Sequence, residues 1–389
     1  MTAVRLNCRV ASLAIGLALF AYLPAFAQAP PIPPPPPDPA PLPLDGVPIA
    51  AEPPPAPPPA PNASEPVSKP AAEAFSSLGG FGAGPGGGIG ALLSPTIGNM
   101  PVRASLGFYW FPSEPVKYQS TSLAEYREDF SISAPVWQDN RNEWSISAGV
   151  HSDEFHTSAI LPNTLQAFPD DLIDVRFGTA YRHEFDNDWI AGIGGSFGSA
   201  SDQPFHSVNE LTGSLNAFLR VPSFDRDAWL FTISYSTNSQ INIPIPGVAY
   251  LWIPSDYFQA VIGFPFASAN YMPTDDLTLS VSYALLTTVH ARATYRLAPP
   301  LRVYAAFDWD NESYFRVGRE DDRDRFFYYE KRLSAGVLYT LGPNVNFDFS
   351  AGYAFNRYFF EGQTLSDDHN NRIDVGDGPY LAAKLQFRY

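Results

Sequence analysis

The chain has 389 residues, of which 45% are hydrophobic, 14% aromatic and only 16% charged, and its formal net charge is −16. A charged fraction this far below the roughly 25% of soluble globular proteins indicates that part of the surface does not face water. The acidic balance argues against nucleic acid as a partner, because binding to phosphates requires a basic surface.

Residues 1–27 have the pattern of a secretory signal peptide. Two arginines precede an apolar run over 10–23, and Ala25-Phe26-Ala27 is a small-residue cleavage pattern. The run is shorter than the about 20 residues that a membrane-spanning helix needs. We therefore expect export with cleavage, which also removes Cys8, the single cysteine.

Two segments of biased composition follow the signal peptide. Half of the 40 prolines lie within residues 28–78, which we expect to be a disordered, extended periplasmic linker, because proline fixes φ and supplies no donor. This arm is either passive or binds the cell wall or a periplasmic protein. Residues 79–100 are rich in glycine and are expected to be flexible, with entry into a barrel lumen as the alternative.

From residue 101 onward, apolar and polar residues alternate. In 229–236, for example, Trp229, Phe231, Ile233 and Tyr235 alternate with small polar residues. A period of two places alternate side chains on opposite faces of a strand. We expect strands near residues 102–111, 126–137, 143–153, 172–184, 189–199, 209–221, 228–238, 248–253, 257–264, 276–285, 288–297, 301–310, 327–340, 345–358 and 379–389.

Short turns and long polar stretches connect these strands. Turn sequences such as Asp186-Asn187-Asp188 and Gly342-Pro343-Asn344 alternate with loops expected at 112–125, 152–170, 311–325 and 361–378. Fifteen segments is an odd number, whereas single-chain bacterial barrels have an even number of strands. Five prolines between residues 244 and 273 either hide one strand or remove one.

The strands favour a membrane barrel over a soluble sandwich. Most are about 10 to 14 residues long, close to a tilted membrane crossing, and aromatic residues cluster at their ends. The last strand has Leu385, Phe387 and Tyr389 on one face, which resembles the signal read by the barrel-insertion machinery. We predict an all-β protein of the bacterial cell outer membrane: a closed antiparallel transmembrane β-barrel over 101–389, surrounded by lipid, with about 14 strands (range 12 to 16).

Residues 101–389 resemble a family of uncharacterised outer-membrane β-barrel proteins. The resemblance lies in Pro244-Ile245-Pro246-Gly247-Val248-Ala249-Tyr250, Pro254-Ser255, Ile262-Gly263-Phe264-Pro265 and Tyr271-Met272-Pro273. The resemblance implies a barrel fold but does not indicate a substrate, since the family is defined only as a domain of unknown function. The proline-rich arm lies outside it.

No catalytic residue, cofactor or metal site is expected. The six histidines are scattered, and His151 and Ser152 are chain neighbours that point to opposite faces of a strand. An outer-membrane hydrolase is therefore the weakest alternative, and the sequence predicts a protein that is not an enzyme.

Charged residues on the faces opposite the apolar stripes are expected to line the lumen, because an Arg or Lys facing lipid near the membrane midplane costs about 2 to 4 kcal/mol. Their basic excess favours anions in an open pore, and the alternative is a closed barrel whose lumen charges pair with one another. We therefore predict a porin-like channel or envelope protein without an identifiable substrate, with a non-conducting structural or surface-binding barrel as the alternative. The predicted lumen residues are Arg176, Arg182, Glu210, Arg292, Arg296, Arg302, Asp308, Asp348, Lys384 and Arg388.

Overall fold

The computed structural model describes residues 97–239, 241, 243–284 and 288–389. The expected signal peptide (1–27), the proline-rich linker (28–78) and residues 79–96 of the glycine-rich segment lie outside the described residues. In the described part of the chain, no helix is both long and apolar enough to cross a membrane.

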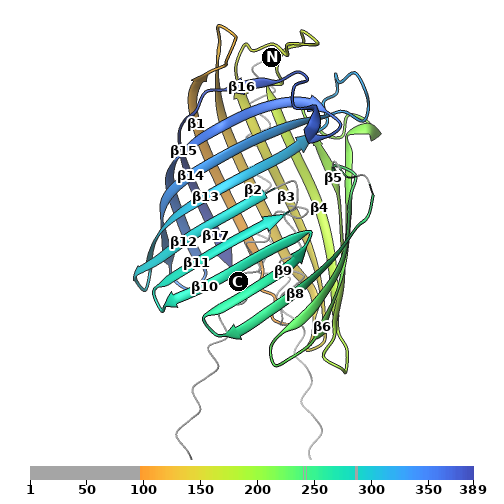
Figure 1. Ribbon diagram of the computed structural model, residues 1–389, viewed down its shortest axis with the longest axis vertical. Coiled ribbons are helices and arrows are strands. Elements are labelled where there is room, and N and C mark those ends of the chain that lie inside the picture. Colours follow the sequence, from red (N-terminus) through yellow and green to blue (C-terminus); the bar gives the residue numbers. More distant parts are fainter. Residues whose placement is uncertain (1–96, 240, 242, 285–287) are drawn as a thin grey trace, which may run out of the picture. The chain divides into compact units, whose positions relative to one another are not determined.

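Seventeen strands form one antiparallel sheet that closes on itself (Figure 1). Each strand pairs with the next from β1 to β15, then β15 pairs with β17 and β17 with β1, so sixteen strands make the ring and the three-residue β16 is extra. The strands are β1 (Arg103–Pro115), β2 (Ser122–Gln138), β3 (Asn142–His156), β4 (Asp171–Glu184), β5 (Ile190–Ser201), β6 (Leu211–Pro222), β7 (Ala228–Ser236), β8 (Ile245–Ser255), β9 (Phe258–Phe264), β10 (Phe266–Thr274), β11 (Leu277–Ala284), β12 (Thr288–Ala298), β13 (Leu301–Tyr314), β14 (Arg325–Leu341), β15 (Val345–Gly362), β16 (Ile373–Val375) and β17 (Gly378–Arg388).

The closed barrel is confirmed, and its sixteen strands lie at the upper limit of the expected range. The segment 244–273, with its five prolines, contains an additional strand, β10, which is not among the strands expected from the sequence. Three of its prolines lie outside the regular pairing: Pro265 connects β9 to β10, and Pro254 and Pro273 lie at register shifts. Bulges and strand ends are the places where a sheet tolerates proline.

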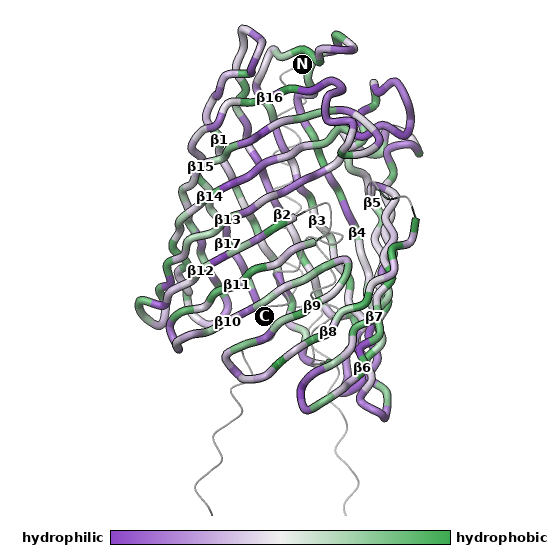
Figure 2. The backbone as a smooth tube through the Cα atoms, in the orientation of Figure 1, coloured by the Kyte–Doolittle hydropathy of each residue, from purple (hydrophilic) through white to green (hydrophobic). Residues whose placement is uncertain are grey.

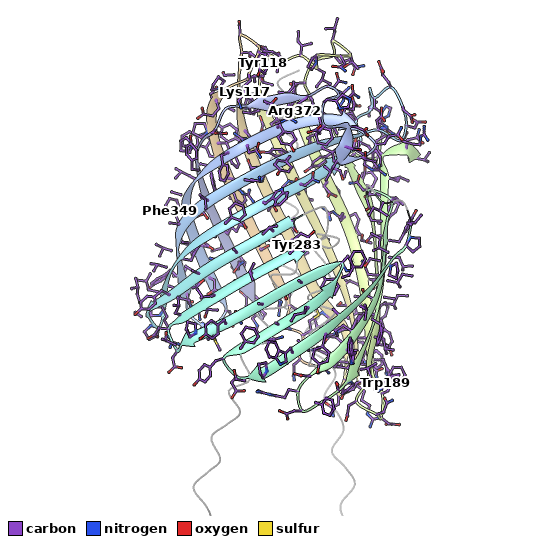
Figure 3. The ribbon with its side chains drawn as sticks, viewed as in Figure 1. Lys117, Tyr118, Trp189, Tyr283, Phe349 and Arg372 are labelled. Carbon is purple, nitrogen blue, oxygen red and sulfur yellow. The ribbon has the colours of Figure 1, made fainter. Side chains whose placement is uncertain are left out.

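The two ends of the barrel differ as the alternation of turns and loops predicted. One end, here called the turn end, carries short connections such as 139–141, 299–300 and 342–344, whereas the other, the loop end, carries 157–170, 315–324 and 363–377. Figure 3 shows Trp189 at the turn end and Tyr118 at the loop end. The expected loops are corrected at their edges: residues 112–115, 122–125, 154–156 and 311–314 belong to β1, β2, β3 and β13.

The outer surface is apolar, as strand β7 illustrates. Trp229, Phe231 and Ile233 are exposed, while Leu230, Thr232 and Ser234 between them are buried. Exposed large hydrophobic side chains recur on strands around the barrel, and Figure 2 shows hydrophobic and hydrophilic residues interleaved along the strands. A closed sheet with apolar side chains outward and polar ones inward is the design of a transmembrane barrel.

Candidate functional site in the barrel lumen

Polar side chains from strands that are not neighbours in the sheet meet inside the barrel. His151 of β3 lies 3.1 Å from Glu312 of β13, and Arg357 of β15 donates to Glu125 of β2 at 2.6 Å. Other strands separate each pair in the sheet order, so these contacts cross the lumen. A barrel of sixteen strands encloses more space than its own side chains fill, and the lumen is therefore the candidate functional site.

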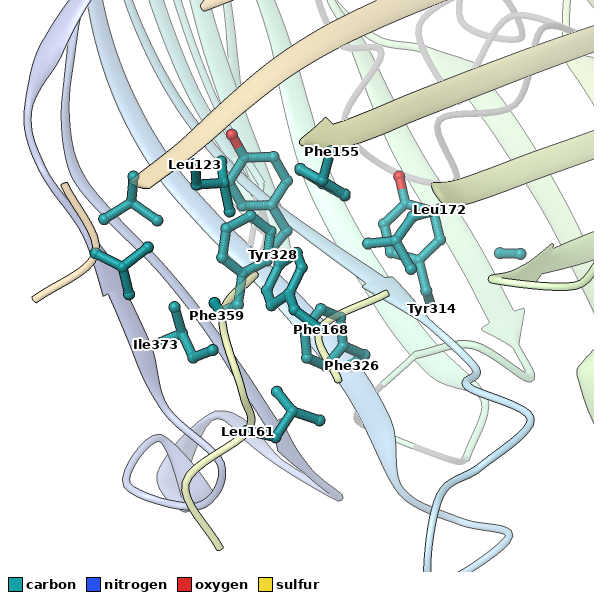
Figure 4. Packing of buried hydrophobic residues seen from close by; sticks show 14 residues of the cluster. Leu123, Phe155, Leu161, Phe168, Leu172, Tyr314, Phe326, Tyr328, Phe359 and Ile373 are labelled. Atoms are coloured by element: carbon teal, nitrogen blue, oxygen red, sulfur yellow. The ribbon is translucent and has the colours of Figure 1, made fainter. Parts of the chain in front are cut away.

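A lid of apolar side chains covers part of the lumen at the loop end. Leu161 and Phe168, from the β3–β4 loop, are buried against Phe155, Phe326 and Phe359 on the strands (Figure 4). The ring of Phe168 lies edge-on to that of Phe359, with centroids 4.9 Å apart. Burial of this kind contributes about 1.5 to 3 kcal/mol for each large apolar side chain, which holds the loop down over the lumen.

The β15–β17 connection helps to fix this lid. The side-chain oxygen of Asn371, which is buried, accepts hydrogen bonds from the backbone N–H groups of Asn163 (2.9 Å) and Thr164 (3.1 Å). Asn371 in turn donates to Glu361 at 2.8 Å. The side chain of Asn163 also donates to that of Asn370 at 2.8 Å. The two loops are thus linked by several hydrogen bonds, and the lid is a single packed unit.

A buried layer of ion pairs contacts the lid. Arg127 donates to Glu125 at 2.8 Å and contacts Glu330 at 3.4 Å, while Arg357 donates to Glu125 at 2.6 Å and to Glu330 at 3.0 Å. The hydroxyl oxygen of Tyr328, a residue of the lid cluster, lies 2.8 Å from both carboxylates and donates its one hydrogen to either of them. Arg127 also bonds to Asp153 at 2.7 Å, and Arg332 contacts Glu330 at 3.2 Å, so three guanidinium groups face three carboxylates. Pairing of opposite charges is what allows them to be buried.

A cavity of about 780 Å³ lies in the lumen and is lined largely by polar side chains. Two histidines face it: His151 bonds to Asp129 and Asp153, and His290 bonds to Asp308 at 2.7 Å. The charged residues of the lining are six acids, Asp129, Asp174, Asp308, Asp310, Glu312 and Asp348, and five bases, Arg127, Arg176, Arg292, Arg332 and Lys384.

At the turn end the inward faces are apolar on one side of the barrel. Ile190, Phe218, Leu230 and Phe266 form a buried cluster there, and Ile97, from the segment that precedes β1, packs into it. This apolar patch and the lid bracket the polar middle of the lumen.

The predicted lumen residues fall into three groups. Arg176, Arg292, Asp308, Asp348 and Lys384 line the cavity. Four others lie outside the cavity lining. Arg182 forms a buried ion pair with Glu143 at 2.7 Å, and Arg296 forms a solvent-exposed pair with Asp276 at 2.8 Å. Arg302 lies opposite Arg296 in the β12–β13 ladder, and Arg388 lies opposite Arg103 in the β1–β17 ladder. Glu210 belongs to a short 3₁₀ helix (Val208–Glu210) in the β5–β6 loop and not to a strand.

Glu210 nevertheless anchors two loops. Its carboxylate accepts hydrogen bonds from Ser207 at 2.6 and 2.7 Å and from Arg319, in the β13–β14 loop, at 3.2 Å. Burial by itself raises the pKa of the Glu210 carboxyl, but the hydrogen bonds from Ser207 and Arg319 outweigh it and hold that pKa below its usual value.

The residues of the expected insertion signal lie on the outer face of β17. Leu385 pairs with Leu106 and Phe347, and Phe387 pairs with Ala104 and Val345. Tyr389 closes the ring, because its backbone N–H and C=O both bond to Val102 at 2.9 Å. Their recognition by an insertion machinery stays a prediction.

Several lumen acids were missed from the sequence, namely Glu125, Asp129, Asp153, Asp174, Asp310, Glu312 and Glu330. A usable signal was present in β2, where Glu125, Arg127, Asp129 and Ser131 alternate with Tyr126 and Phe130. The expected basic excess of the lumen is therefore replaced by a nearly balanced lining whose charges are paired.

No protein-family model matches the chain, and no curated protein matches it. Similar solved structures include an outer membrane channel from Pseudomonas putida F1 (9% identity, TM-score 0.34, 76% of this chain and 98% of that chain) and Pseudomonas aeruginosa OccK7 (OpdD) (10%, 0.38, 74% and 99%). A Pseudomonas aeruginosa FadL homologue is similar at 10% identity and a TM-score of 0.34, over 80% of this chain and 98% of that one. These are all outer-membrane β-barrels, while the barrel assignment of this chain stands on its own strand pairing.

Proposed function

We propose that this protein is an integral outer-membrane barrel that admits small polar solutes into a lumen constricted at the loop end, and so acts as a narrow, lidded channel. The observation that carries the proposal is the cavity of about 780 Å³, which is lined by charged groups of both signs and by many serines. A lumen built only as scaffolding has no need for so much unfilled polar space.

The lining predicts weak charge selectivity. Arg176 pairs with Asp174, Arg292 with Asp348, and Arg332 with Asp310. Because the fixed charges nearly cancel, the lumen field favours neither anions nor cations strongly. The anion preference expected from the sequence is therefore not part of the proposal.

The second candidate, a non-conducting barrel, is favoured by the lid and by the ion-pair layer, which together obstruct the loop end. Conductance distinguishes the two functions. The full-length protein is purified, refolded into planar bilayers, and compared with the double variant Leu161→Ser and Phe168→Ser, which removes the apolar packing of the lid.

The matched control is the double variant Ile160→Ser and Leu165→Ser, which changes exposed residues of the same loop. We expect rare, small current steps from the wild type and the control, and larger or more frequent steps from the lid variant. If all three proteins insert as intact barrels by circular dichroism and none conducts, the channel proposal is wrong and the non-conducting barrel is supported.

A further inference from the structure

Four donor atoms converge on one point of the lumen. The Nε2 atom of His151 lies 3.1 Å from Oδ2 of Asp153 and 3.1 Å from Oε2 of Glu312. The hydroxyl oxygen of Tyr314 lies 3.2 Å and 2.7 Å from the same two carboxylate oxygens. With metal–ligand bonds of about 2.0 to 2.2 Å, neighbouring ligand atoms around one ion are about 3 Å apart, so this spacing fits a single coordination shell.

The outer partners hold these donors in the orientation that a metal needs. Asp129 bonds to Nδ1 of His151 at 2.5 Å, which leaves Nε2 directed at the two carboxylates. Arg127 donates a hydrogen bond to Oδ1 of Asp153 at 2.7 Å, and the other oxygen, Oδ2, faces the histidine. A carboxylate behind a ligating histidine, and hydrogen bonds to the other oxygen of a ligating carboxylate, are the usual outer shell of metal sites.

The carboxylates of Asp153 and Glu312 have few positively charged partners. Arg357 bonds to both Glu125 and Glu330, and Arg332 also contacts Glu330 at 3.2 Å. Arg127 is shared among Glu125, Glu330 and Asp153. Lys384 and Asp129 flank Gly107 from neighbouring strands, which places that lysine beside Asp129. Asp153 and Glu312 are then left with only His151 and a share of Arg127 to offset their two negative charges.

Asp174 gives an independent observation on the charge of the same cavity. Asp174 lies directly opposite His151 in the β3–β4 ladder and lines the same cavity. Its side chain is 8% exposed and one of its oxygens bonds to Arg176, but its Oδ1 is buried without a hydrogen-bond partner. A buried carboxylate oxygen without a partner is unfavourable, and an ion or its bound water in this part of the cavity would supply the missing partner.

We propose that the lumen binds a divalent first-row transition metal ion, such as zinc or manganese, through His151, Asp153 and Glu312, with Tyr314 beside the site. One imidazole and two carboxylates suit these ions better than calcium or magnesium, which prefer oxygen alone, or copper(I), which prefers sulfur. Metal binding does not depend on conduction, so the site stands even if the barrel is a closed one.

The test is metal binding by the full-length protein, purified in detergent and stripped with a chelator. Zinc chloride and manganese chloride are titrated by calorimetry into the wild type, His151→Gln, Glu312→Gln and the control His290→Gln, which alters the other lumen histidine with carboxylate partners. We expect one ion per wild-type chain and per control chain, and affinity lower by roughly tenfold or more in the two site variants.

X-ray absorption of the zinc-loaded wild type keeps the proposal testable if a site variant does not fold. We expect a shell of nitrogen and oxygen neighbours that includes a single imidazole. Failure of the wild type to bind either ion, a shell with no imidazole or more than one, or equal loss in His290→Gln would overturn the proposal. In that case the four groups form only an ion-pair and hydrogen-bond cluster.

Discussion

The ion-pair layer inside the barrel gives the sharpest stability prediction. Arg357 is 1% exposed and bonds to Glu125, Glu330 and Tyr328 at 2.6, 3.0 and 3.2 Å. In the variant Arg357→Met, both carboxylates remain buried; Glu125 then keeps only Arg127, and Glu330 keeps Arg127 at 3.4 Å and Arg332 at 3.2 Å. Removing one partner of a buried ion pair costs about 3 to 5 kcal/mol, because a charge is left without compensation. We expect a loss of that size in the free energy of unfolding.

Urea unfolding in phospholipid vesicles, followed by tryptophan fluorescence, measures this loss. The matched control is Arg296→Met, which breaks the pair with Asp276, whose two side chains are 44% and 49% exposed; exposed pairs contribute about 0 to 1 kcal/mol. The double variant of Arg357→Met with Glu125→Gln should lose less than the single one, because it removes one orphaned charge. An Arg357→Met loss no greater than that of the control would refute the argument that these charges are interdependent.

Three further predictions concern the outer face, the loops and the chain end. Ile233→Arg, on the lipid-facing side of β7, should destabilise the barrel by about 2 to 4 kcal/mol in vesicles if it lies near the midplane, whereas Leu165→Arg on an exposed loop should cost little. Hydrogen bonds from Ser207 and Arg319 lower the pKa of Glu210, so these contacts stabilise the fold above the ordinary carboxylate pKa and are lost as pH falls through the lowered value. The difference in thermal stability between wild type and Glu210→Gln should therefore shrink from pH 6 to pH 2. Deletion of Tyr389 should lower the yield of heat-modifiable barrel in outer-membrane fractions, and an unchanged yield would remove this residue from the insertion signal.

The fold was predictable because lipid and lumen impose opposite demands on successive residues. Within the membrane, outward positions such as Phe231 and Ile233 are apolar, and inward ones such as Thr232 and Ser234 are small and polar. Apolar and polar residues therefore alternate along the sequence with a period of two. The alternation of short turns and long loops then followed from up-and-down connectivity.

The candidate site was less predictable because this contrast vanishes beyond the hydrocarbon. At the loop ends of β3 and β13, outward residues such as Ser152 and Asn311 are as polar as their inward neighbours Asp153 and Glu312, so the segments looked like loops. The ladder continues there all the same. Moreover, the contact of His151 with Glu312 joins strands far apart in sequence and exists only once the sheet has closed.

The size of the barrel explains why the lumen is built of paired charges. Sixteen strands enclose a volume that inward side chains cannot fill, and the space is divided between an apolar lid, an ion-pair layer and the remaining cavity. Each buried charge is tolerated because a partner offsets its desolvation, so removing one charge exposes another. The pairing is complete around Arg357 and incomplete around His151, where Asp153, Glu312 and the unbonded oxygen of Asp174 gather. A cation from solution should therefore bind beside His151 before it binds elsewhere in the lumen.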